Sequence, residues 1–100
     1  MDAARDDSKI VKVLTTENFD QEVKATPLMF IHFYDVDDIM ATALVFDWNI
    51  TARHLLKDKP PVIAAKIDAK AHQSITDRFE IIHFPAFIMF NHGDWTWMPN

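Results

Sequence analysis

The densest group of chemically competent side chains is acidic: Asp35, Asp37 and Asp38 stand within four positions. Three carboxylates so close together can bind a hard divalent cation. The only glycine is Gly93, so no EF-hand-like loop can form around them, and no second acidic cluster lies close in sequence. Because the three residues precede an expected helix, we predict that they cap that helix and complement its dipole rather than hold a metal.

His32 is the histidine of greatest interest, because it lies in an apolar run that should be buried. A functional His32 would be a proton shuttle or a pH sensor. A structural His32 would be a neutral core residue with a hydrogen-bonded ring nitrogen, and we favour this second interpretation. Pairing His32 with Asp38 in a non-thiol activity has no support from their spacing. The other histidines lack the HxxxH or HxH spacing of a zinc site: His54, His72, His83 and His92.

Nucleophilic and redox chemistry are restricted by what the chain lacks. There is no cysteine, which excludes disulfides, thiolate-ligated metals and every thiol mechanism. There is no G-x-S-x-G motif, and a single glycine cannot build a phosphate-binding loop. We therefore expect no catalytic residue, no metal and no cofactor.

Length and composition are those of one soluble globular domain. The chain has 100 residues, 49% of them hydrophobic and 25% charged. The net charge of −5 argues against binding to nucleic acid. No apolar run approaches the ~20 residues of a membrane-spanning helix. We expect a single domain over residues 1–100, with 1–8 as a flexible lead-in.

Hydrophobic periodicity predicts eight elements in the order β-α-β-α-β-α-β-β. Strands are expected at 9–14, 28–34, 62–67, 86–90 and 95–97, and helices at about 19–24, 38–56 and 71–79. Alternation of strands with helices favours parallel pairing through right-handed crossovers. The last two strands flank a tight turn at 91–94 and must be antiparallel. The prediction is an α/β fold with a mixed five-stranded sheet and helices on both faces.

This order, with several short matches between about residues 10 and 98, resembles the thioredoxin-like domain of the protein disulfide isomerase family. The matching stretches are 13–20, Phe33-Tyr34, 57–69, Arg78-Phe79 with Phe84-Pro85, and 91–95. The resemblance implies a thioredoxin-like fold. It also implies a closing helix after the last strand, for which residues 98–100 leave no room, so we expect that helix to be absent.

The catalytic motif of that family is lost. After Phe-Tyr the family reads Ala-Pro-Trp-Cys-Gly-His-Cys-Lys, whereas residues 35–42 read Asp-Val-Asp-Asp-Ile-Met-Ala-Thr. Asp38 and Ala41 stand where the cysteines would be, and neither can carry out thiol–disulfide exchange. The resemblance also places His32 where the family has a buried Glu, and it implies a cis Phe84–Pro85 bond.

The resemblance thus implies a redox-inactive, chaperone-like domain that is not an enzyme and binds a peptide, an unfolded protein or a protein partner without covalent chemistry. The implied groove is formed by Val36, Asp38, Ile39, Met40, His83, Phe84 and Pro85. The alternative is an engineered or structural thioredoxin-fold scaffold without a ligand, which the low glycine content also fits. The compartment implied by the resemblance is the lumen of the endoplasmic reticulum, although the chain shows no signal peptide or retention motif.

The last two strands carry large apolar side chains that a closing helix would otherwise cover. Exposed apolar area of this kind usually marks an interface. We therefore expect a homodimer through one bare sheet face, or a partner segment that covers it. The residues concerned are Phe87, Met89, Trp95 and Trp97.

Overall fold

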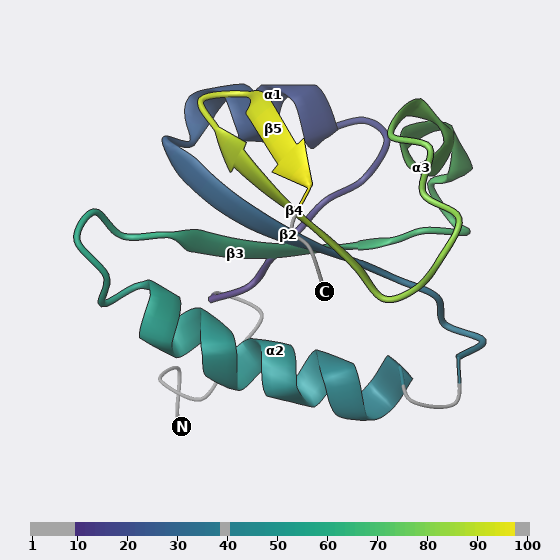
Figure 1. Cartoon of the computed structure of the whole chain (residues 1–100), viewed down its shortest axis with the longest axis horizontal. Coiled ribbons are helices and arrows are strands. Elements are labelled where there is room, and N and C mark those ends of the chain that lie inside the picture. Colours follow the sequence, from purple (N-terminus) through teal and green to yellow (C-terminus); the bar gives the residue numbers. More distant parts are fainter. Residues whose placement is uncertain (1–9, 39–40, 98–100) are drawn as a thin grey trace.

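The computed structural model describes residues 10–38 and 41–97, and the order and types of the expected elements are confirmed (Figure 1). The elements are β1 (Lys12–Val13), α1 (Phe19–Ala25), β2 (Leu28–Tyr34), α2 (Ala41–Leu55), β3 (Ile63–Asp68), α3 (Gln73–Arg78), β4 (Ala86–Asn91) and β5 (Asp94–Trp97). The largest difference from expectation is β1, which has only two residues. The expected lead-in, residues 1–8, lies outside the described residues.

The five strands form one mixed sheet in the order β1-β3-β2-β4-β5. β3 pairs in parallel with both β1 and β2, whereas β4 is antiparallel to β2 and to β5. β2 and β3, which are joined through α2, are parallel as predicted, and the hairpin pair β4–β5 is antiparallel as predicted. β4 also follows a helix and was expected to be parallel, but it runs antiparallel to β2, so that expectation was wrong. The reason is that α3 and the loop after it return the chain to the end of the sheet at which β3 stops, where Phe33 pairs with both Ile67 and Ala86.

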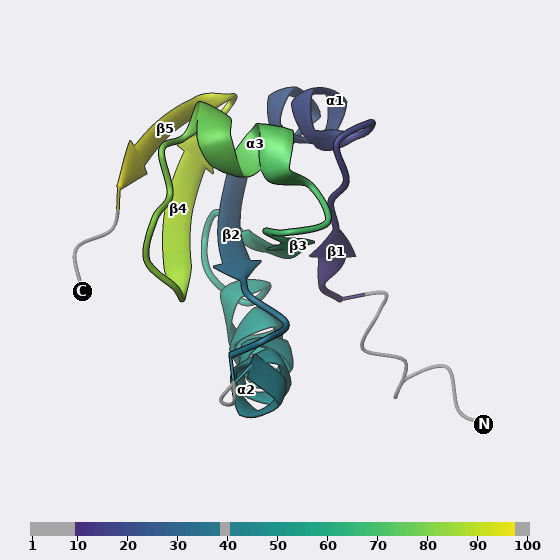
Figure 2. The ribbon, with the colours of Figure 1, turned by 90° about the vertical axis from the view of Figure 1, so that its right-hand side faces the viewer.

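Helices cover both faces of the sheet, with α1 and α3 on one side and α2 on the other (Figures 1 and 2). The central strand β2 is apolar on both faces because it faces two separate cores. Met29, Ile31 and Phe33 belong to the core beneath α1 and α3. Phe30 faces the second core, where Trp48 of α2 packs.

The four residues predicted to form one interface do not share a face of the sheet. Phe87 and Met89 lie opposite His32 and Phe30 in the β2–β4 register, on the α2 side. Trp95 pairs with Phe90, which is in the core on the α1 and α3 side. Trp97 pairs with Ile88, which is in the same core as Phe90. The expectation of one bare face was therefore wrong, because the alternation of β4 and β5 was assigned without their register. Self-association through either set stays a prediction.

The β4–β5 hairpin turns through two residues with positive φ, His92 at 52° and Gly93 at 91°. Both central residues of a type I′ turn need positive φ, a region that asparagine adopts more easily than histidine. The backbone N–H of His92 donates to the carbonyl of Pro27 at 2.9 Å, which holds the turn beside β2.

We expect His92→Asn to raise the free energy of unfolding by about 1 kcal/mol, because asparagine relieves the strain and keeps the backbone N–H. Urea denaturation of the two proteins measures the difference. Gly93→Ala is the opposite control and should destabilise the chain, since alanine is strained at a φ of 91°. A His92→Asn protein no more stable than the parent would show that the turn carries no such strain.

Candidate functional site

The turn after β2 and the loop before β4 leave the sheet at the same edge. Phe33, near the end of β2, pairs with Ala86, the first residue of β4, and both connecting segments lie at the same end of the sheet in Figure 1. The sequence-predicted residues fall on these two segments: Val36 and Asp38 on residues 35–38, and His83, Phe84 and Pro85 on residues 80–85. Ile39 and Met40, also predicted, lie outside the described residues.

Apolar side chains are exposed on both segments. Val36 is 53% exposed and Ile82 is 78% exposed, the highest value among the large hydrophobic residues that the structure describes. Phe84 is half-buried and packs against the main core, and the bond between Phe84 and Pro85 is cis. We refer to Val36, Ile82 and Phe84 as the apolar edge.

Sequence reasoning missed Ile82. The sequence signal that could have identified it is the pair Ile81-Ile82, directly before the turn at residues 83–85. Adjacent residues of an extended segment point to opposite sides, and in the structure Ile81 is buried while Ile82 is exposed.

The segment 35–38 is a turn organised by its own first residue. The carboxylate of Asp35 accepts the backbone N–H of Asp37 at 3.0 Å, and its carbonyl accepts the N–H of Asp38 at 3.0 Å. This is an Asx turn, in which a short acidic side chain replaces a backbone hydrogen bond. The first turn of α2 contains no acidic residue. The predicted capping role was therefore wrong for Asp35, whose carboxylate serves the turn instead.

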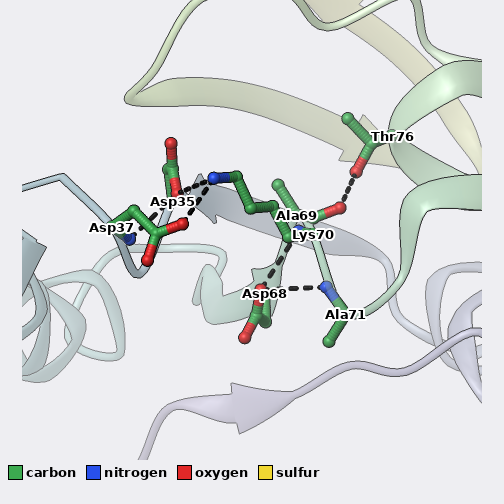
Figure 3. Close-up of polar contacts among 7 residues, drawn as sticks. All are labelled: Asp35, Asp37, Asp68, Ala69, Lys70, Ala71 and Thr76. Carbon is green, nitrogen blue, oxygen red and sulfur yellow. Dashed lines mark hydrogen bonds and ion pairs between the residues drawn. The ribbon is translucent and has the colours of Figure 1, made fainter.

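Lys70 ties this turn to the loop between β3 and α3 (Figure 3). Its Nζ lies 2.5 Å from Oδ2 of Asp37 and 3.5 Å from Oδ1 of Asp35. The hydrogen bond to Asp37 is the main cause that raises the pKa of Lys70 above its usual value. Thirty-three positions separate Lys70 from Asp37, so only the fold brings them together.

The loop that carries Lys70 is fixed at several points (Figure 3). Oδ1 of Asp68 accepts the backbone N–H groups of Lys70 and Ala71, each at 3.1 Å. The N–H of Ala69 donates to the carbonyl of Tyr34 at 2.9 Å, and the hydroxyl of Thr76 donates to the carbonyl of Ala69 at 2.7 Å. The ammonium group is thus presented to the Asp35 turn from an ordered loop.

His32 lies in the core, away from solvent. It is 0% exposed and stacks on Phe87, with ring centroids 4.8 Å apart and an interplanar angle of 14°. Trp48 contacts it edge-on at 5.7 Å. Burial, with a smaller contribution from the charge of Lys66, lowers the pKa of His32 to about 4. The core position was predicted correctly, but the expected hydrogen bond was not: neither ring nitrogen has a partner among the described residues.

A surface hollow of about 260 Å³ lies elsewhere, between α1, α3 and the β4–β5 hairpin. Phe79, Phe90 and Trp95 line it, and Asp20 and Arg78 form an ion pair at its rim, 2.6 Å apart. The hydrogen bond from Arg78 is the main cause that lowers the pKa of Asp20. This hollow is near the hairpin end of β4, whereas the apolar edge is near its first residue.

Two further searches apply to residues 10–38 and 41–97. No three histidine or acidic side chains there come together in a group that could hold a metal ion. No helix there is both long enough and apolar enough to cross a membrane.

Comparison with known proteins gives consistent results. The family model described as thioredoxin matches residues 10–98. Human protein disulfide-isomerase A4 is 31% identical over 85 residues, which cover 85% of this chain and 13% of that protein. Protein disulfide-isomerase 1 of Caenorhabditis elegans is 26% identical over 87 residues, covering 87% of this chain and 18% of its own length. The chain therefore spans less than a fifth of the length of these relatives.

Solved structures show the same fold. The first thioredoxin domain of mouse protein disulfide-isomerase A4 superposes with a TM-score of 0.84 at 23% identity, covering 91% of this chain and 65% of that one. The zinc-bound form of human ERp44 gives 0.78 at 20% identity, covering 86% and 24%. With the family model matched over nearly the whole chain and no cysteine anywhere in it, the chain belongs to the thioredoxin family as a cysteine-free domain similar to those of protein disulfide-isomerases.

Proposed function

We propose that the chain binds apolar segments of peptides or unfolded proteins at the apolar edge, without covalent chemistry. The observation that carries this proposal is the exposure of Val36 and Ile82, at 53% and 78%, on two segments that leave the same edge of the sheet. Burying a large aliphatic side chain is worth about 1.5–3 kcal/mol. Contact with an apolar segment would bury these side chains and so stabilise the complex.

The same proposal assigns no enzymatic step to the chain. Thiol–disulfide exchange requires a thiolate, and the sequence contains no cysteine. We expect insulin reduction by dithiothreitol to proceed at the rate measured without protein, with a cysteine-containing thioredoxin as the positive control. A rate above that background in a metal-free assay would contradict the assignment. The resemblance to protein disulfide-isomerases further suggests the lumen of the endoplasmic reticulum as the compartment.

The binding proposal is tested by a titration followed by NMR. Unfolded, carboxymethylated polypeptide is added to ¹⁵N-labelled chain, and amide shift changes are mapped. We expect the changes to cluster at residues 35–38 and 81–86. Ile82→Ser should weaken binding several-fold, whereas Ile50→Ser should leave it unchanged, because Ile50 is an exposed isoleucine on α2.

Two results would contradict this function. Shifts centred on Phe79 and Trp95 would place binding at the hollow by the hairpin instead. Absence of shifts at millimolar polypeptide would favour the alternative, a structural or engineered scaffold without a ligand.

A further inference from the structure

The two segments that form the apolar edge contain acidic side chains but no lysine or arginine. Residues 35–38 contain Asp35, Asp37 and Asp38, residues 80–85 contain Glu80, and neither segment has a lysine or arginine. Beside them, Asp68 ends β3 and Lys70 follows in the loop, so this stretch adds one charge of each sign. Apolar and acidic residues therefore follow one another along both segments.

Lys70 compensates this charge only in part. It lies between Asp35 and Asp37. The side chains of Lys70 and Asp37 are 51% and 70% exposed, so water screens the attraction between their charges. The charge of Asp68, after burial, contributes to raising the pKa of Tyr34, the last residue of β2. Lys66 is the lysine of β3 and pairs with His32, two residues before the end of β2. Carboxylates therefore outnumber lysine and arginine side chains on the segments at this edge.

We propose that the apolar edge selects apolar segments that are flanked by lysine or arginine. This inference rests on the proposed function and names the class of its ligand. Contact with Val36, Ile82 and Phe84 provides affinity for any apolar segment. The surrounding carboxylates distinguish cationic flanks from acidic ones, because opposite charges speed association and like charges oppose it.

Lys70 then acts as a competitor for the same carboxylates. A lysine or arginine of the ligand can replace its ammonium group beside Asp37 at little cost, since an exposed ion pair contributes little to stability. Removing the charge of Lys70 should therefore strengthen binding of a cationic ligand. A purely structural lysine would have the opposite effect when removed.

The test uses two synthetic peptides with one shared core, Leu-Ile-Phe-Leu, flanked on each side by two lysines or by two glutamates. Affinities are measured with the whole chain by NMR titration at 20 mM and 500 mM NaCl. We expect the lysine-flanked peptide to bind at least about fivefold more tightly at low salt. The ratio should fall below about twofold at high salt, where screening acts over about 3–5 Å.

Variants locate the effect. Asp37→Asn with Glu80→Gln should weaken binding of the lysine-flanked peptide several-fold, and Lys70→Gln should strengthen it. Asp58→Asn with Asp94→Asn is the matched control: it makes the same change of net charge at exposed positions outside the apolar edge and should change nothing.

The outcomes separate the two proposals. Equal binding of both peptides, independent of salt, would overturn the charge selection and leave the proposed function intact. Binding of neither peptide would overturn the proposed function itself. Weaker binding by the Lys70→Gln protein, with its fold intact by circular dichroism, would contradict the competitor role and with it the selection by these carboxylates.

Discussion

Phe79→Ala is expected to lower the free energy of unfolding by about 3–5 kcal/mol, the usual cost of emptying a buried phenylalanine site. Phe79 is 5% exposed and its ring lies 5.1 Å from that of Trp95, 5.5 Å from Phe19 and 5.6 Å from Phe90. These rings come from α1, β4 and β5, so one side chain after α3 joins three other elements. Its removal leaves a cavity that none of the rigid neighbours can fill.

Urea denaturation followed by far-ultraviolet circular dichroism measures this loss. Ile82→Ala is the comparison, since it also shortens a large apolar side chain but at a position 78% exposed, and its effect should stay within about 0.5 kcal/mol. If Phe79→Ala cost less than 1 kcal/mol, the packing of α3 against the sheet would be wrong.

The central strand and the helix after it are the parts of the fold that the sequence predicts best. Leu28 to Tyr34 is an apolar run on both faces, which requires cover on both sides and hence an interior strand between helices. β2 begins and ends where that run does. The helix that follows was also foreseen, because Trp48, Ala52 and Leu55 recur at helical spacing, and all three belong to the core beneath α2.

The features that escaped sequence reasoning depend on register and on contacts between distant segments. Trp95 and Phe87 were assigned to one face, but the pairing of β4 with β5 decides the side, and alternation within each strand does not reveal it. Similarly, the carboxylates at 35–38 were expected to cap α2, whereas Lys70 reaches them only because the β3–α3 loop returns to the same edge of the sheet. The apolar edge itself was predicted from the resemblance at Val36 and Phe84, but without Ile82.

His32 supplies the second large effect, a loss of stability in mild acid. Burial lowers the pKa of His32 from 6.5 to about 4 in the folded chain. Between these pH values the unfolded chain binds a proton at this ring and the folded chain does not. Above pH 6.5 the ring is neutral in both states, and its protonation does not affect the free energy of unfolding. As the pH falls from 6.5 toward 4, proton binding favours the unfolded chain and the free energy of unfolding decreases. A difference of this size corresponds to about 3 kcal/mol.

The matched variant is His32→Phe, which keeps a planar ring against Phe87 and removes both unpaired nitrogens. We expect its free energy of unfolding at pH 7 to be about 1–3 kcal/mol higher, because the folded chain no longer buries a polar ring without a hydrogen-bond partner. It should also lose most of the dependence on pH between 6.5 and 4. His54→Phe serves as the control, since it makes the same replacement at an exposed position of α2.

Urea denaturation at half-unit steps from pH 7.5 to 4.5 distinguishes the possibilities. Asp20 adds a loss in the same direction, but only below its ordinary value of 3.8, because its pKa is lowered by Arg78. The interval from pH 6.5 to 4.5 therefore lies above the range in which Asp20 contributes. If the parent and His32→Phe proteins lost stability equally over that interval, a partner for the ring would have to exist, and the unpaired burial of His32 would be refuted.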